Sequence, residues 1–223
     1  GGMVDGLLLI LPTASSEYLT TFRERKFPCV LIDHRGSNET GPSVGATNYQ
    51  GGYDATRYLI ELGHKRIGMI TGNPEMVCAV DRLKGYQQAL RDNNISPDPD
   101  LIRTGNFYQP RGFECARELL SLNPVPTAIF AANDVSAFGA MEAIRDSGRR
   151  IGNDISLIGF DDIPAASNVY PPLTTVRQPL YEMGATATRM LLDLIGNPAR
   201  KGERVLLPTS LVIRDSCRPP AGQ

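Results

Sequence analysis

The sequence predicts an α/β fold built on parallel sheets, and three observations support this prediction. Short apolar runs of β-forming residues alternate with longer segments whose apolar residues recur at helical spacing. Glycine, proline and asparagine separate these segments, so the connections are short. Polar residues directly follow two of the apolar runs, as they do where open parallel sheets bind ligands. Helices that connect parallel strands produce this order along a chain.

The expected strands cover residues 6–10, 29–33, 44–47, 67–71, 101–104, 127–130, 155–160 and 211–214. Five segments between them have an apolar helix face, formed by Ala55, Tyr58, Leu59 and Leu62; by Leu83, Tyr86 and Leu90; by Phe113, Ala116 and Leu120; by Phe138, Met141 and Ile144; and by Met183, Ala187, Met190, Leu191 and Leu194. Gly63, Gly148 and Gly196 supply left-handed helix ends, and the Asn-Pro pairs at 123–124 and 197–198 prevent a helix from continuing.

Length and composition restrict the class of protein. A chain of 223 residues can bury a core without crosslinks. Its four cysteines are widely spaced and form no C-x-x-C pair, which favours reduced thiols in a cytoplasmic protein over a zinc site. No apolar run approaches the roughly 18 residues that a membrane span needs, so no membrane partner is expected. The net charge of −1 lacks the basic character of a domain that binds nucleic acid by itself.

Polar side chains come directly after two consecutive expected strands. Asn133 and Asp134 follow the apolar run 128–132, and Asp161 and Asp162 follow the run 155–160. Taken alone, Asn133 reads as an ordinary helix N-cap, and the two aspartates read as loop residues that accept backbone hydrogen bonds. The carboxyl ends of parallel strands are also where α/β sheets bind small molecules, so a binding role is the other interpretation.

Arg82 is harder to explain as a surface residue. It lies near the start of the helix that carries Leu83 and Tyr86, where the helix dipole disfavours a cation. We therefore expect an acidic or oxygen-rich partner for it. Two other basic features have simpler interpretations: His64, which follows Gly63, reads as a helix cap, and the arginine cluster at 145–150 reads as a solvated turn.

Several strings of this sequence resemble the effector-binding region of the lactose-repressor (LacI/GalR) family of bacterial transcription regulators. The clearest are ANDVSAFGAMEAI at 132–144, GFDD at 159–162 and PPLTTVRQP at 171–179. GGYDATRYLIELGHKRIGMITG, DRLKGYQQAL and VLLPTSLVIRDS also match in type and order, so the resemblance covers nearly the whole chain.

The resemblance implies two Rossmann-like lobes with parallel sheets joined by three crossovers, as in type I periplasmic binding proteins. It assigns residues 1–64 and 178–198 to the N-terminal lobe, and residues 65–177 and 199–218 to the C-terminal lobe. In this family a β-α-β unit precedes the strand at 6–10, and a helix-turn-helix precedes that unit. Neither is found in this sequence, so the first lobe is expected to be incomplete and operator DNA is expected to bind an N-terminal domain that is not part of it.

The resemblance also implies a ligand site. Arg82, Asn133 and Asp161 match an arginine, an asparagine and an aspartate that face one another across the effector, and together they offer donors and acceptors for the adjacent hydroxyls of a polyol. Phe107 matches an aromatic residue that stacks on the ligand, the alternative being a phenylalanine of the core or of the lobe surface. Cys78 stands where relatives often carry a small hydroxyl residue, and Met76 occupies a variable pocket position; a buried filler and loop packing are their respective alternatives. Asp162 is expected to be structural.

Enzyme signatures are missing from the sequence. There is no G-x-S-x-G elbow, no P-loop and no G-x-G-x-x-G motif, and neither of the two histidines lies near a candidate nucleophile. Asp161 and Asp162 are adjacent and cannot flank a substrate as a glycosidase pair does. No enzyme activity, cofactor or metal is therefore expected.

The favoured interpretation is the effector-binding and dimerisation region of a LacI-type regulator. It would bind a small polar ligand, with a sugar as the expected class, between its lobes, and ligand-biased hinge closure would alter DNA binding by a homodimer. The alternative is a sugar-binding receptor of a transport system, which shares the fold and the pocket.

Overall fold

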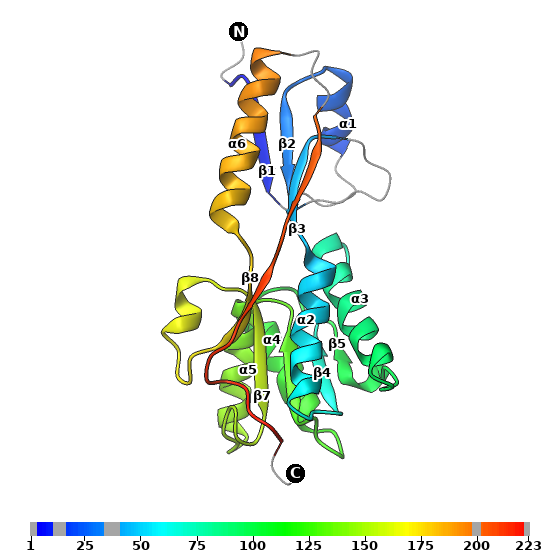
Figure 1. The fold of residues 1–223 in the computed structure, drawn as a ribbon, viewed down its shortest axis with the longest axis vertical. Coiled ribbons are helices and arrows are strands. Elements are labelled where there is room, and N and C mark those ends of the chain that lie inside the picture. The colour runs from blue at the N-terminus through cyan, green and yellow to red at the C-terminus, as the bar shows by residue number, and fades with distance from the viewer. Residues whose placement is uncertain (1–3, 11–16, 34–40, 198–201, 221–223) are drawn as a thin grey trace. The chain divides into compact units, whose positions relative to one another are not determined.

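The computed structural model describes residues 4–10, 17–33, 41–197 and 202–220 (Figure 1). The chain divides into two compact units. The first unit contains Gly1–Thr47, Glu75–Cys78 and Pro179–Pro208, and the second contains Asn48–Pro74, Ala79–Gln178 and Thr209–Gln223. The predicted α/β fold with parallel sheets is confirmed in both units.

The first unit is built on a four-stranded parallel sheet with the strand order β1-β2-β3-β9. Its strands are β1 (Leu7–Ile10), β2 (Cys29–Ile32), β3 (Ser43–Ala46) and β9 (Arg204–Leu207), and its helices are α1 (Glu17–Glu24) and α6 (Leu180–Gly196). The apolar face of α6 packs on the central strands, where Met183 and Ala187 meet Val30 and Val44. This contact buries the helix face that the sequence pattern predicts.

The second unit is built on a six-stranded sheet with the order β10-β8-β7-β6-β4-β5. Every pair in this sheet is parallel except β8 with β10, which is antiparallel. Its strands are β4 (Ile67–Ile70), β5 (Ile102–Arg103), β6 (Ala128–Ala131), β7 (Ser156–Asp161), β8 (Thr174–Arg177) and β10 (Ser210–Val212). Its helices are α2 (Asn48–Glu61), α3 (Val77–Asp92, whose first two residues group with the first unit), α4 (Gln109–Leu120) and α5 (Asp134–Asp146), with the 3-10 turns Pro99–Leu101 and Pro164–Ser167.

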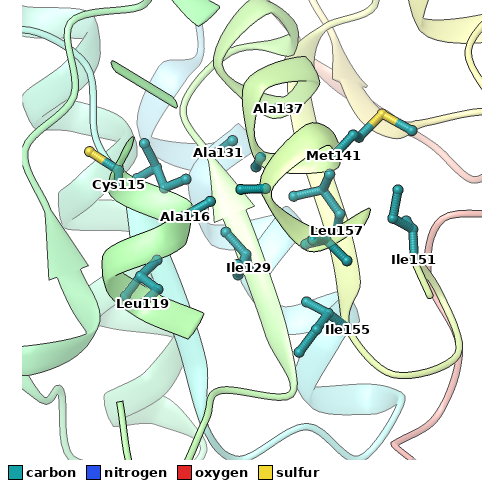
Figure 2. Packing of buried hydrophobic residues seen from close by; sticks show 14 of the residues in the cluster. Cys115, Ala116, Leu119, Ile129, Ala131, Ala137, Met141, Ile151, Ile155 and Leu157 are labelled. Carbon is teal, nitrogen blue, oxygen red and sulfur yellow. The ribbon is translucent and has the colours of Figure 1, made fainter. Parts of the chain in front are cut away.

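Helices cover both faces of this sheet because successive residues of a strand point to opposite sides. Strand β6 shows the alternation: Ile129 and Ala131 join the core beneath α4 and α5, whereas Ala128 and Phe130 join the core beneath α2 and α3. Figure 2 shows the first of these cores, in which the residues from α4 and α5 close over the strand side chains. With both faces buried, the strands read as continuous apolar runs.

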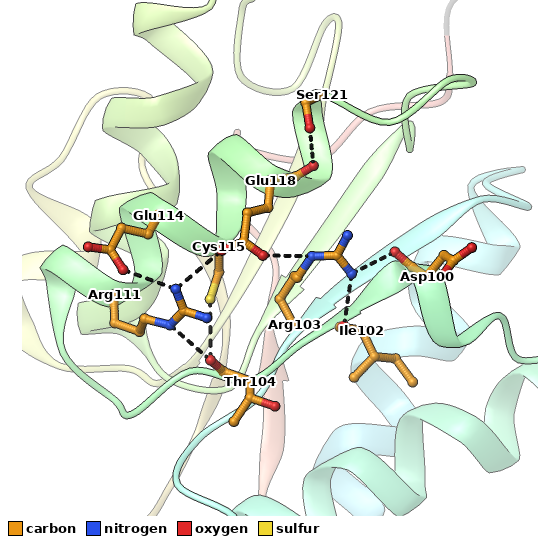
Figure 3. Close-up of polar contacts among 9 residues, drawn as sticks. All are labelled: Asp100, Ile102, Arg103, Thr104, Arg111, Glu114, Cys115, Glu118 and Ser121. Carbon is orange, nitrogen blue, oxygen red and sulfur yellow. Dashed lines mark hydrogen bonds and ion pairs between the residues drawn. The ribbon is translucent and has the colours of Figure 1, made fainter.

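The edge strand β5 is attached to α4 by the ion pair of Arg103 with Glu118 as well as by packing, and Arg111 forms further ion pairs within α4 (Figure 3). Arg103 Nε lies 2.9 Å from Glu118 Oε2, and Arg111 Nη1 lies 3.0 Å from Glu114 Oε2 and 3.2 Å from Glu118 Oε1. Arg111 also donates to the carbonyl oxygen of Thr104, 3.0 Å away. Each of these two arginines therefore has a carboxylate partner.

The two units differ from the predicted lobes in two segments. Helix α2 packs against β6, β8 and β10 and so belongs to the second unit, although the prediction places residues up to 64 in the first lobe. Strand β9 pairs with β3 and so belongs to the first unit, although the prediction places 199–218 in the second. Helix packing and strand pairing decide both assignments, and the periodicity of apolar residues in the sequence contains no information about either contact.

Candidate functional site

Arg82 of α3 is the centre of a polar cluster in the second unit. Its side chain is 3% exposed, and its guanidinium is held from several sides. Nε donates to Asn48 Oδ1 at 2.9 Å, Nη1 donates to the carbonyl oxygen of Ala132, and Nη1 lies 3.5 Å from Asp161 Oδ1. The oxygen-rich partner expected for Arg82 is thus present, and it comes from α2 and from the ends of β6 and β7. A buried guanidinium requires such partners because its charge has left water.

Two aromatic rings complete the surroundings of this guanidinium. Its central carbon lies 3.7 Å from the ring centroid of Phe160 and 5.8 Å from that of Phe107, which places the cation within reach of both π faces. Phe107 is partly buried, and its ring covers Gly72, where a Cβ atom would come within 1.9 Å of the ring. Phe107 therefore lies beside Arg82 and forms part of the same cluster.

Asp161 ends β7 in a backbone conformation that is rare for a residue with a side chain. Its φ is +117°, and the neighbouring Asp162 and the more distant Phe107 also have positive φ values of 58° and 70°. Strained residues of this kind gather at binding sites, where the surrounding structure holds them. Asp161 Oδ1 accepts a hydrogen bond of 2.7 Å from Gln178 Nε2, and the side chain keeps 20% of its surface exposed. Asp161 is therefore more accessible than Arg82.

Asn133 has the capping role that the sequence predicts, and its binding role stays a prediction. It is the N-cap of α5, where its Oδ1 accepts from the backbone N–H of Ser136 at 2.9 Å. Its Nδ2 donates to the carbonyl oxygen of Phe107 at 3.0 Å, which ties the loop of Phe107 to the carboxyl end of β6. The capping interpretation is confirmed, and the same side chain lies in the cluster with Phe107.

Asp162 and Asp134 support the loop that carries Asp161. Asp162 accepts from Arg214 at 2.6 Å and from Arg177 at 2.7 Å, which confirms the structural role expected for it. Burial acts to raise the pKa of Asp162, but the hydrogen bonds from the two arginines outweigh this and hold it below its ordinary value. Asp134 is fully buried, and burial raises the pKa of its carboxyl group to about 7.

The pocket positions predicted for Met76 and Cys78 stay a prediction, because these two residues and the cluster around Arg82 are grouped in different units. Both fall in the segment Glu75–Cys78, which belongs to the first unit, while the cluster belongs to the second. Cys78 is buried and Met76 is partly buried. Cys78 lies four residues before Arg82 on α3, so the two residues share one face of the helix.

Gln178 was not among the site residues predicted from the sequence. It is 8% exposed, and while its Nε2 donates to Asp161, its Oε1 is buried without a hydrogen-bond partner among the described residues. Burying an unpaired amide oxygen is costly, so this atom is suited to accept a hydrogen bond from a ligand hydroxyl or amine. The PPLTTVRQP string contains Gln178, and its position just after β8 was the available signal.

The cluster offers hydrogen-bond acceptors and donors beside an aromatic ring, which suits binding of a polar molecule better than catalysis. In the described ranges of the chain, no group of three or more His, Cys, Asp or Glu side chains is placed to hold a metal ion. None of the helices in these ranges combines the length and apolar character of a membrane span. All four cysteines are free thiols.

Comparison with known proteins identifies the relatives of this chain. Residues 56–217 match the periplasmic binding protein-like domain. The HTH-type transcriptional repressor PurR of Histophilus somni (strain 129Pt) is 37% identical over 218 residues, a match that covers 96% of this chain and 65% of that repressor. The HTH-type transcriptional repressor CytR of Escherichia coli (strain K12) is 40% identical over 221 residues, covering 96% and 63%. The chain thus spans less than two thirds of the length of these relatives.

Solved structures of similar fold come from the same kind of protein. A complex of the transcriptional regulator CelR with cellobiose superposes with a TM-score of 0.92 at 36% identity, covering 96% of this chain and 66% of that one. A LacI family transcriptional regulator from Enterococcus faecium with bound ribose has a TM-score of 0.89 at 29% identity, covering 97% and 80%. Because the relatives are transcriptional repressors and regulators, the prediction that this chain is not an enzyme is confirmed.

Proposed function

Because the chain belongs to the LacI/GalR family of regulators with a periplasmic-binding-protein-like domain, we propose that it is the region of a bacterial transcription repressor that binds a small effector and forms a homodimer. The single observation that carries the effector role is the cluster at the carboxyl ends of β6 and β7. There the side chains of Arg82, Asn133 and Asp161 gather with the ring of Phe107. Operator DNA would bind a part of the protein outside this sequence.

The ligand that fits this cluster is a small polar molecule with adjacent hydroxyl groups, and a sugar is the class we propose. Carboxylate and amide groups can accept and donate to neighbouring hydroxyls, and an aromatic ring can cover the apolar face of a sugar ring. Asp161 and Gln178 are the most direct candidates, because one is partly exposed and the other has an unpaired acceptor. That cellobiose and ribose are bound in two structural relatives supports the same class.

Regulation would follow from linkage between the effector and DNA. A ligand shifts a conformational equilibrium only as far as it binds one state more tightly than the other, and the coupling is reciprocal. If the effector favours the state with low operator affinity, it induces transcription; if it favours the other state, it acts as a co-repressor. The proposed site is compatible with either direction.

The test begins with calorimetry of the 223-residue chain against a panel of pentoses, hexoses and disaccharides. We expect at least one sugar to bind, and we expect the Asp161→Asn variant to bind it at least about tenfold more weakly. The full-length protein is then titrated with its operator, with and without that sugar. A sugar that binds the chain but leaves operator affinity unchanged would favour the alternative, a sugar receptor of a transport system. Absence of binding across the panel would refute the proposed ligand class.

A further inference from the structure

A pocket lies in the second unit, away from the cluster around Arg82. Its volume is about 450 Å³. It is formed where the C-terminal end of α5, the turn before β7 and the last residues of the second unit meet. Its charged and aromatic lining residues are Arg145, Arg149, Arg150, Arg218, Tyr170 and Asp215. Four arginines thus face a single carboxylate among the described lining residues.

Two of the four guanidinium groups donate to neutral partners, and these hydrogen bonds do not offset their charge. Arg145 donates to the carbonyl oxygen of Tyr170, and Arg218 Nη1 donates to Asn153 Oδ1 at 3.0 Å. Arg150 is the exception, since its Nη2 lies 3.1 Å from Asp154 Oδ1. The pocket therefore has a clear excess of positive charge in a chain whose net charge is −1.

Arg149 is the most informative member of this group. It is only partly exposed, yet its guanidinium makes no hydrogen bond or ion pair with any side chain or carbonyl group in the part of the chain that the structure describes. Its backbone N–H is used to cap α5, where it donates to the carbonyl oxygen of Ile144 at 3.1 Å. The main chain is thus fixed while the five N–H donors of the side chain remain available to a ligand.

The arginines between β5 and α4 provide a comparison within the same unit. Arg103 and Arg111 meet the carboxylates of Glu114 and Glu118 (Figure 3). In these two arginines, which hold neighbouring elements in place, carboxylate groups offset the positive charge. Among the pocket arginines, Arg150 pairs with Asp154, and the same carboxylate also attracts Arg149 from a longer distance without a hydrogen bond. One carboxylate shared in this way does not neutralise all four arginines, so securing the fold does not account for all of them.

The helix dipole explains only part of the cluster. The C-terminal end of α5 carries a partial negative charge of about half an electron, which one cation in the last turn offsets, and Arg145 occupies that turn. Arg149 and Arg218 lie beyond the helix, and Arg218 comes from the far end of the sequence. Their convergence on one pocket exceeds what the dipole requires.

We propose that this pocket binds a small molecule that carries a phosphate group. Guanidinium groups bind phosphate oxygens through paired, charge-assisted hydrogen bonds, and Arg149 and Arg218 can supply them. The volume falls within the range of about 300–1,000 Å³ that is typical of small-molecule sites. Tyr170 and Pro171 add an apolar wall for the organic part of the ligand.

The pocket and the cluster around Arg82 lie at opposite ends of the same elements. Asp161 ends β7, whereas Asn153 of the pocket precedes it; Asn133 caps the start of α5, whereas Arg149 follows its end. A helix of 13 residues is about 20 Å long. The phosphate site is therefore separate from the proposed sugar site, and each can be tested without the other.

The test is calorimetric titration of the 223-residue chain with inorganic pyrophosphate and with glucose 6-phosphate at low salt. We expect Arg149→Gln to weaken both at least about tenfold, because one charged donor fork is lost. Arg57→Gln is the matched control, since Arg57 is an exposed arginine of the same unit that does not line the pocket. This control should bind both probes as the unchanged chain does. Thermal unfolding of each variant checks that it is folded.

Three outcomes would overturn the proposal. In one, pyrophosphate and glucose 6-phosphate both fail to bind at millimolar concentration. In another, Arg149→Gln and Arg57→Gln lose affinity equally, which would indicate general attraction of anions. In the third, a DNA duplex of about two helical turns binds through Arg149 while the small phosphates do not, which would make the pocket part of a nucleic-acid surface. Binding of neutral sugars should be the same in Arg149→Gln as in the unchanged chain, so failure here would leave the effector proposal intact.

Discussion

Gly52 of α2 lies directly against the main chain of Arg82, so closely that a Cβ atom on residue 52 would come within 2.4 Å of the Arg82 carbonyl oxygen. The approach is reciprocal along the two helices, since a Cβ atom on Gly85 of α3 would come within 2.1 Å of the carbonyl oxygen of Tyr49. Small residues on both sides therefore let α2 and α3 come into backbone contact. This contact determines where α3 holds the Arg82 side chain. Gly52 therefore affects the geometry of the proposed site although it has no side chain that could bind a ligand.

Replacing Gly52 with alanine should therefore disturb both stability and ligand binding. The added methyl group meets backbone rather than a movable side chain, so we expect a loss of about 1–3 kcal/mol in the free energy of unfolding and weaker sugar binding. Gly184→Ala is the matched control, because Gly184 lies in α6 and a Cβ atom there meets nothing within 4 Å. Alanine at that helix position should stabilise the protein by about 0.5–1 kcal/mol. Urea denaturation of both variants measures the difference, and equal effects would contradict the argument.

Arg82→Ala and Asp161→Ala should each weaken binding of the identified effector. Each change removes a charged hydrogen-bonding group, for which we expect a cost of about 1.5–3 kcal/mol, or roughly 10- to 150-fold in Kd. Isothermal titration calorimetry measures this. Arg82→Ala should also lower stability, because it leaves Asn48 and the Ala132 carbonyl group without their buried donor. Near-native affinity in both variants would remove these residues from the site.

Gln178 should discriminate among ligands. Its Oε1 has no partner among the described residues, so Gln178→Leu removes this acceptor without breaking a hydrogen bond to it, although the bond from Nε2 to Asp161 is lost. Gln178→Glu keeps an acceptor of the same shape but places a second carboxylate beside Asp161. Comparing the two variants therefore distinguishes the effect of side-chain shape on affinity from the effect of charge. We expect the parent sugar to bind Gln178→Leu more weakly than it binds the unchanged chain. For a deoxy analogue that lacks the hydroxyl group contacted by Gln178, the difference in affinity between the two proteins should be smaller. Equal losses for every analogue would show that Gln178 only positions Asp161.

Asp134 should make stability depend on pH. Burial raises the pKa of its carboxyl group from 3.8 to about 7 in the folded chain. The folded state then keeps a proton that the unfolded state has already released, so this contribution to stability is full below about pH 4 and is lost as the pH rises through 7. The slope should reach at most about 1.4 kcal/mol per pH unit. Urea denaturation from about pH 5 to about pH 8 should show this fall in the unchanged chain, and the fall should be smaller in Asp134→Asn.

The Asp134→Asn variant keeps the local hydrogen bonds while removing the titration. Its side-chain amide can accept from the backbone N–H of Ile163 and donate to the hydroxyl of Thr175, which replaces the two hydrogen bonds of the carboxylate. Glu61→Gln is the control, since Glu61 is an exposed carboxylate of α2. An identical pH dependence in Asp134→Asn and in the unchanged chain would contradict the assignment.

The full-length protein should sediment as a homodimer at micromolar concentration. A regulator that reads a palindromic operator needs two DNA-binding heads related by twofold symmetry, whereas a transport receptor works as a monomer. The exposed side of the helix region 50–62 is the part of the second unit where we expect contact. A strictly monomeric species with and without effector would favour the transport receptor.

Local signals in the sequence predicted most of the elements, because periodicity and helix-stop residues act over short distances. The stretch 183–194 was predicted as helical and lies within α6, and the strand expected at 127–130 is β6, displaced by one residue. The strand expected at 101–104 was less accurate, because a proline-led 3-10 turn occupies Pro99–Leu101 and only Ile102–Arg103 pair with β4. The strand β9 was missed, since it has only four residues and follows a charged stretch, which gave a weak pattern.

Long-range contacts were the part that the sequence did not reveal. His64 was expected to cap a helix, and its backbone N–H does so at the end of α2, where it donates to the Leu59 carbonyl oxygen at 3.1 Å. The surroundings of its side chain were not expected: the ring is buried, and its nitrogens lie 2.8 Å from Thr127 Oγ1, 3.1 Å from Ser156 Oγ and 2.9 Å from the Arg218 carbonyl oxygen. Those partners come from residues 63 to 154 positions away in the chain. The need of Arg82 for an acidic partner could be predicted from the helix dipole, whereas the stacking of Phe160 on its guanidinium could not.

Every contact described for the Arg82 guanidinium comes from the second unit, and this affects how the site would select a ligand. The cation is held in one orientation before a ligand binds, and the groups that hold it are Asn48, the Ala132 carbonyl group, Asp161 and Phe160. A side chain that is already immobile loses little conformational entropy on binding, so affinity is not reduced by the cost of ordering it. The same rigidity prevents the group from adapting to a different pattern of hydroxyls. Such a site rejects a wrong stereoisomer by leaving a polar group unpaired, and selectivity rather than adaptability is what this arrangement provides.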